Sequence, residues 1–177
     1  MAASRRLSRQ ARRDQLVSAA IPLVARRGPA DLSLDEVAER AGVTRNLLYH
    51  YFPRGRSDLV SAVLDDAERQ LVGQSQELDQ AISRILDHAL AATHAWRIHR
   101  MAGALPAFTR RAEATAAAVD ALRDFTGAEA TPLSDLALHG YVAYAEAVLD
   151  GARTAGIPRS DVRGLLARTL RAVVAAG

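Results

Sequence analysis

The chain has 177 residues and no cysteine, which excludes disulfide bonds, thiolate metal sites and cysteine nucleophiles. Apolar residues make up 49% of it, as in a folded globular protein, but no stretch approaches the roughly 20 consecutive apolar residues of a membrane span. The net charge of +3 is unevenly distributed, because residues 1–60 carry eleven arginines and six acids while the remainder carries twelve arginines and fourteen acids. The basic first third indicates a polyanionic partner bound at one end of the molecule.

The N-terminus is basic, and no apolar run follows it as in a secretory signal, so a cytoplasmic protein is expected. Residues 1–10 are expected to form a flexible tail. Five arginines lie in or just after this tail: Arg5, Arg6, Arg9, Arg12 and Arg13. Two interpretations stay open, an arm that lies along DNA and a tail that is only solvated.

The first predicted helix is amphipathic, with apolar residues at spacings of three and four. These residues are Leu16, Ala19, Ala20, Leu23 and Val24. Gly28 followed by Pro29 is typical of a helix end. Pro22 removes the backbone hydrogen bond to the carbonyl of Ser18, which predicts a kink rather than a break.

Two short helices joined by a tight turn are predicted next. Ser33 and Glu36 have the spacing of a capping box, and they begin a helix that Gly42 ends. Gly42 is expected to need a positive φ, which costs little for glycine. Thr44 is a suitable N-cap for the second helix. The inward side of that helix carries three large residues: Leu47, Leu48 and Tyr51. This pattern predicts a helix-turn-helix.

The polar side of the second helix distinguishes a DNA-reading helix from a structural corner. It carries Arg45, Asn46, Tyr49 and His50. Side chains of this kind hydrogen-bond base edges and phosphates in a major groove, whereas a solvated face more often carries Glu and Lys. Because no acidic residue lies between Arg40 and Arg56, the pattern favours a DNA-reading helix.

The segment from Ser33 to Val60, SLDEVAERAGVTRNLLYHYFPRGRSDLV, resembles the tetracycline-repressor (TetR) family of bacterial regulators. With the preceding helix, the resemblance covers about residues 11–71. It implies a three-helix DNA-binding domain with a site of seven residues: Ser33, Thr44, Arg45, Asn46, Tyr49, His50 and Arg56. By position, Arg45 and Asn46 would read bases, while Thr44, Tyr49, His50 and Arg56 would contact the sugar-phosphate backbone. Asn46 and Leu47 depart from the usual family residues, so the operator sequence stays open.

Beyond residue 75, the chain is predicted to form a helical body that extends to residue 177. Apolar positions from Leu78 to Trp96 mark one face of a long helix. Those from Phe108 to Leu122 mark another, after an interruption at Pro106. Thr131 and the proline after it open a third helix, which is expected to end at Gly156.

The third of these helices is apolar on two sides, so in so small a domain it needs a second partner. One side carries Leu133, Ala137, Gly140, Tyr144 and Val148, and the other carries Leu138, Val142, Ala145 and Leu149. The last helix also has a broad apolar face: Val162, Leu165, Leu166, Thr169, Leu170 and Val173. The family resemblance implies that these two helices build a four-helix bundle across a dimer axis. A homodimer through residues of about 132–175 is therefore expected.

The resemblance also implies a small-molecule effector among the middle helices. The candidate lining residues are Trp96, Arg97, Arg100, Met101, Phe108, Tyr141 and Tyr144. Plain core packing is the favoured alternative for each aromatic residue, while the basic residues around Trp96 keep an anionic or aromatic effector open. His88, His94 and His99 lack metal-ligand spacing with carboxylates, so neither a metal nor a cofactor is expected.

Together these features predict an all-α protein, with a DNA-binding head at 11–71 joined by a long helix to a dimerisation and effector-binding domain at 75–177. The predicted function is a repressor that binds a palindromic operator on double-stranded DNA as a homodimer. No catalytic motif is found, so an enzyme is not expected, and no membrane partner is expected either. The alternative is a helical protein-interaction or small-molecule-binding module, which does not explain the polar side of the second helix. The regulated genes and the choice between repression and activation stay open.

Overall fold

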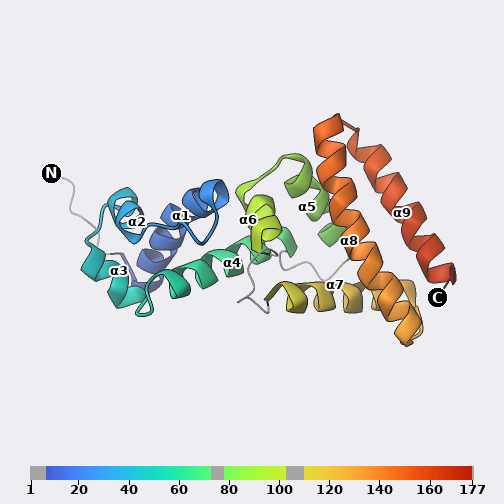
Figure 1. Ribbon diagram of the computed structural model, residues 1–177, viewed down its shortest axis with the longest axis horizontal. Helices are drawn as coiled ribbons and strands as arrows, with labels where there is room; N and C mark the ends of the chain where they lie inside the picture. Colours follow the sequence, from blue (N-terminus) through green and yellow to red (C-terminus); the bar gives the residue numbers. More distant parts are fainter. Residues whose placement is uncertain (1–6, 73–77, 103–109, 177) are drawn as a thin grey trace.

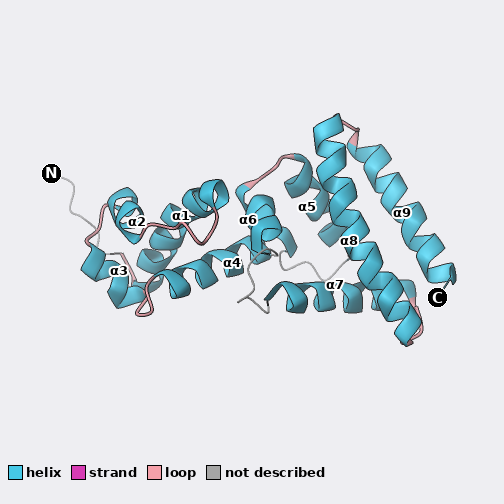
Figure 2. Cartoon of the chain, viewed as in Figure 1, coloured by secondary structure: helices cyan, strands magenta, loops and turns pink. Residues whose placement is uncertain are grey.

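The computed structural model describes residues 7–72, 78–102 and 110–176, and in these ranges every regular element is an α-helix (Figures 1 and 2). The helices are α1 Arg9–Arg27, α2 Leu34–Ala41, α3 Arg45–Tyr51, α4 Arg56–Val72, α5 Leu78–Leu90, α6 His94–Ala102, α7 Arg110–Thr126, α8 Pro132–Ala155 and α9 Arg159–Ala176. The predicted all-α class with an N-terminal helix-turn-helix is confirmed. None of these helices is both long enough and apolar enough to cross a membrane.

The first three helices form a compact head around the buried side of α1. The helix continues through Pro22 without a break and ends at Gly28, as predicted. Its apolar stripe faces α4, where Val63 is fully buried, and the same core takes in Leu48 and Phe52 at the end of α3. Burial of these apolar side chains stabilises the position of α3.

The cap of α2 differs in one respect from the predicted capping box. The Ser33 hydroxyl accepts from the backbone N–H of Glu36 at 3.4 Å, as predicted. The Glu36 carboxylate does not return to the backbone of Ser33 but pairs with Arg27 at 2.7 Å and with Arg26 at 3.4 Å. The two arginines at the end of α1 lie close enough to take this carboxylate, so it joins α2 to α1 instead of capping its own helix.

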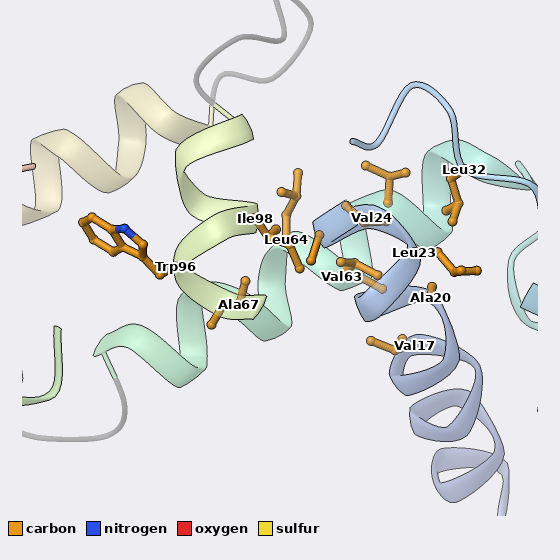
Figure 3. Close-up of a cluster of buried hydrophobic side chains, with 14 of the residues drawn as sticks. Val17, Ala20, Leu23, Val24, Leu32, Val63, Leu64, Ala67, Trp96 and Ile98 are labelled. Atoms are coloured by element: carbon orange, nitrogen blue, oxygen red, sulfur yellow. The ribbon is translucent and has the colours of Figure 1, made fainter. Parts of the chain in front are cut away.

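The hydrophobic core continues from the head into the body without interruption (Figure 3). Val17, Leu23 and Val24 of α1, Val63 and Leu64 of α4, and Ile98 and Trp96 of α6 belong to this one core, and the Trp96 ring extends from α6 away from α4. The long helix α4 therefore contacts both parts of the molecule, and α6 packs against α1 as well as α4.

The prediction of one long helix over residues 78–96 is wrong, because two helices meet there. Ala92 has a φ of 47°, which no α-helix accommodates. Thr93 begins the new helix α6, since its hydroxyl accepts from the backbone N–H of Trp96 at 3.3 Å. The apolar spacing continues through the break, so periodicity alone could not reveal it.

The last two helices form an antiparallel pair at the far end of the molecule (Figure 1). Thr131 caps α8 in a reciprocal box with Ser134, and Gly156 ends α8 with a φ of 65°. The buried side of α8 carries Leu138, Tyr141, Leu149 and Ala152. Leu166 and Leu170 are also buried, so Leu166 belongs to the interior of this pair rather than to an outer surface.

Candidate nucleic-acid interface

The turn between α2 and α3 sets the direction in which α3 projects. Gly42 has a φ of 64°, in the left-handed region that its sequence position predicted. Its N–H donates to the carbonyl of Glu39 at 3.0 Å, and the N–H of Val43 donates to that of Ala38 at 2.9 Å. The Thr44 hydroxyl then accepts from the backbone N–H of Leu47 at 3.3 Å, so the predicted N-cap of α3 is confirmed.

The helix α3 has one face in the core and one in solvent. Leu48 is fully buried, whereas Leu47 and Tyr51 are half-buried. The opposite face exposes the predicted polar set: Arg45, Asn46, Tyr49 and His50. Six of the seven predicted DNA-binding residues are exposed at this end of the molecule, and only Ser33 is half-buried beneath its helix.

Arg45 is held by two neighbours on the exposed face. One terminal nitrogen, Nη1, donates to both carboxylate oxygens of Asp35, at 3.0 and 2.9 Å. The other, Nη2, lies 3.4 Å from the Tyr49 hydroxyl, and the guanidinium lies 5.7 Å from the centre of the Tyr49 ring. The Tyr49 hydrogen bond and the charge of Asp35 raise the pKa of Arg45 above its ordinary value.

A groove of about 1050 Å³ opens beside α3, between the loop that precedes α2 and the start of α4. Its lining includes Asp31, Arg45, Tyr49, Arg54 and Arg56. Arg56 is the first residue of α4, and its Nη1 donates to the carbonyl of Ala30 at 2.7 Å. The groove brings three arginines to the edge of α3.

Two supports of this face were not predicted from the sequence. Gly55 is buried with a φ of 62°, and a Cβ on it would lie 3.1 Å from the Tyr49 ring and 3.3 Å from Leu34. Asp58 accepts from the backbone N–H of Arg54 at 2.8 Å, a bond that lowers the pKa of its carboxyl. The Pro-Arg-Gly sequence before α4 is a turn signal that could have identified this position.

The body of the molecule contains a second hollow, between α6 and the C-terminal half of α8. This cavity of about 930 Å³ is lined by four predicted effector residues, Trp96, Arg97, Arg100 and Met101, together with Asp150, Arg153 and Thr154. Two other candidates lie elsewhere: Tyr141 donates to the carbonyl of Leu166 at 3.0 Å, and the Tyr144 hydroxyl accepts from Thr169 at 3.4 Å. Burial raises the pKa of Tyr141 to about 12. Phe108 lies outside the described residues.

Polar contacts join α6 to α8 along one side of this cavity. The Trp96 indole N–H donates to Asp150 at 2.9 Å, and Arg100 Nε pairs with the same carboxylate at 2.9 Å. Arg100 also pairs with the buried Glu146, whose other oxygen lies 3.0 Å from His99. No group of three or more potential metal ligands occurs within the described residues, and His99 is engaged by Glu146 instead.

Comparison with known proteins agrees with the resemblance predicted from the sequence. Residues 16–63 match the model of a family described as bacterial regulatory proteins of the TetR family. A 73-residue stretch, 41% of this chain, is 37% identical to the HTH-type transcriptional regulator BetI of Brucella anthropi and covers 36% of that protein. The sequence match to this curated relative therefore spans only about a third of its length.

Solved structures extend the likeness over nearly the whole chain. A TetR-family transcriptional regulator from Streptomyces coelicolor has a TM-score of 0.71 at 25% identity, with 96% of this chain and 83% of that one covered. A TetR-like transcriptional regulator from Rhodococcus sp. RHA1 has a TM-score of 0.69 at 20% identity, and the match covers 97% of this chain and 100% of that one. This structure shows the same fold. These relatives are described as regulators, which agrees with the prediction that the chain is not an enzyme.

Proposed function

Since the chain belongs to the TetR family of bacterial regulatory proteins, we propose that it is a cytoplasmic repressor that binds a palindromic operator as a homodimer. The observation that carries this proposal is the exposed face of α3: Arg45 and Tyr49 line a groove together with Arg56, His50 is also exposed, and no acidic residue is present on the helix itself. A helix of this width fits a major groove, and its side chains match the donors and acceptors found there.

The residues of this surface divide into two roles. Arg45 and Asn46 lie in the first turn of α3, from which side chains reach base edges in a helix-turn-helix. Tyr49 and His50 are exposed in the last turn of α3 and Arg56 is exposed at the start of α4, and they would contact phosphates and fix the register of the helix. Thr44, at the N-cap, would add a phosphate contact near the positive end of the helix dipole.

The homodimer is proposed from the outer face of α8. One stripe of this helix is exposed and entirely apolar: Leu133, Leu136, Gly140, Ala143, Ala147 and Gly151. Leu133 is 58% exposed and Leu136 is 71% exposed, which is costly for leucine in a monomer. The small residues in the middle of the stripe would let a second copy of α8 approach closely. A two-fold dimer would then present two copies of α3 to successive major grooves about 34–36 Å apart.

Titration of the purified chain with random-sequence duplex DNA at low salt tests the DNA-binding role. Binding is expected, and log K should fall linearly with log salt by about 0.9 for each phosphate contacted. A protein-interaction module that does not use DNA would show no binding at any salt concentration, and that result would refute the proposal.

A small-molecule effector is the second part of the proposed function. The cavity between α6 and α8 would hold it, with Arg97 and Arg153 at the rim and the indole of Trp96 in its lining. The position of Met101 links this cavity to the head, since a Cβ on Gly28 would lie 3.9 Å from its sulfur. An effector that moved α6 would therefore act on the end of α1 as well as on α4.

Reciprocal titration is the test of effector control. Trp96 is the only tryptophan, so its emission is expected to report binding of anionic aromatic compounds. An effector that lowers DNA affinity tenfold must itself bind tenfold more weakly to the DNA complex, because the coupling free energy of about 1.4 kcal/mol is shared. A compound that changes the emission but leaves DNA affinity unchanged would not be an effector.

A further inference from the structure

The exposed face that is proposed to read DNA contains one acidic side chain close to Arg45, which is Asp35. Asp35 lies in the first turn of α2, ten residues before Arg45, and both line the groove beside α3. Asp35 and Arg45 side chains are 68% and 52% exposed, so neither is hidden from an incoming duplex. A carboxylate at this position repels the phosphates of DNA, so a second role is needed to explain its presence.

The contribution of this ion pair to folding does not explain why a carboxylate is present at position 35. A pair so exposed gains little stability, because water screens both charges. The helix α2 is already capped by Ser33, and Glu36 already joins it to α1. The main consequence of Asp35 is therefore the position of the Arg45 guanidinium.

We propose that Asp35 is a positioning residue that determines DNA specificity through Arg45, an inference that rests on the proposed DNA-binding function. Asp35 occupies Nη1, and Tyr49 contacts Nη2 and the guanidinium plane. The guanidinium is thereby held between α2 and α3. An unrestrained arginine at this exposed position could hydrogen-bond a phosphate on any duplex. A guanidinium held by Asp35 and Tyr49 can use its remaining donors only on a base that lies in the correct place.

The same contact reduces binding to DNA of random sequence. Asp35 places a negative charge beside Arg45 and offsets part of its attraction to phosphates, so Arg45 adds less to the counterion release that drives sequence-independent binding. On the preferred sequence, the hydrogen bonds of Arg45 to a base compensate for this loss. The pair thus increases the ratio between specific and nonspecific affinity.

Asp35→Asn is the variant that tests this role, because it removes the charge and keeps the shape. The probes are a duplex selected from a random pool by the wild-type chain and a random-sequence duplex. Binding to the random duplex is expected to strengthen, with a salt slope steeper by about 0.9 per chain as Arg45 takes a phosphate. The ratio of the affinity for the selected duplex to that for the random duplex is expected to fall about tenfold, which is the effect of losing one base-specific contact.

Asp31→Asn provides a matched control. Asp31 is exposed in the same groove, and its side chain makes no hydrogen bond or ion pair among the described residues. Its removal should strengthen binding to both duplexes by the same factor and leave the ratio unchanged. If Asp35→Asn behaves in the same way, Asp35 acts only as a negative charge and the inference is overturned.

A double-mutant cycle identifies the residue through which Asp35 acts. In an Arg45→Ala background, Asp35→Asn is expected to leave the affinity ratio unchanged, because the guanidinium that it positions is absent. An equal fall of the ratio in both backgrounds would overturn the inference. A wild-type chain that bound neither duplex would overturn the proposed function itself, so the two failures are distinguishable.

Discussion

Gly140→Asp is expected to convert the protein into a monomer that no longer binds an inverted repeat. Gly140 lies in the middle of the exposed apolar stripe of α8, and a Cβ placed on it has nothing within 4 Å. The substitution therefore fits the isolated chain, but in a two-fold dimer it would bury two carboxylates near the axis. An unpaired buried charge costs about 3–5 kcal/mol, which is enough to dissociate a dimer at micromolar concentration.

Sedimentation equilibrium measures this effect directly, and Ala117→Asp is its control. Ala117 is an exposed alanine in α7, outside the stripe, so its substitution should leave the dimer intact. Leu166 is unsuitable for this test, because it is only 7% exposed between α8 and α9, and a charge there would unfold the pair. A wild-type monomer at micromolar concentration would contradict the proposed dimer, and a dimeric Gly140→Asp variant would show that the interface is elsewhere.

Arg45→Ala is expected to produce the second largest loss. The side chain would contact one base pair in each half of a palindrome, and each such contact contributes about 1–3 kcal/mol of discrimination. Two copies that act independently would then cost about 2–6 kcal/mol on the preferred duplex. The preference at the contacted base pairs should also relax, because no other side chain would read them.

Arg56→Ala provides the contrast in the same binding assay. Its loss removes a phosphate contact, so it is expected to weaken binding similarly on preferred and random duplexes. Tyr49→Phe also removes a proposed phosphate contact, but it is not equivalent to Arg56→Ala, because it removes the hydroxyl that lies 3.4 Å from Arg45 and helps to hold the guanidinium. If Arg45→Ala lowered affinity for both duplexes by the same factor, Arg45 would not be a base-reading residue.

The sequence predicted the parts of the head that depend on short-range chemistry. Ser33, Gly42 and Thr44 act within three or four residues of their partners, so a cap or a positive φ is encoded in the local sequence. The exposed polar face of α3 follows from helical periodicity in the same way. The fold class followed because apolar spacing is helical along nearly the whole chain.

Contacts between distant residues could not be predicted in this way. The pairing of Asp35 with Arg45 depends on how α2 and α3 cross, and that of Trp96 with Asp150 spans 54 residues. The sequence identified two apolar sides on α8, but the exposed stripe shares only Leu133 and Gly140 with them, because α5, α7 and α9 all pack against this helix. Tyr141 and Tyr144 were predicted to line the effector site because an aromatic residue in a core and one in a pocket have the same sequence pattern.

The central claim is that two copies of α3 read an operator from one face of a symmetric dimer. Hydroxyl-radical footprinting on a duplex selected by the wild-type chain tests it most directly. The predicted result is two protected patches related by a two-fold axis, with centres about 34–36 Å apart, and loss of both patches with Gly140→Asp. A single asymmetric patch, or protection that Gly140→Asp leaves unchanged, would contradict the claim.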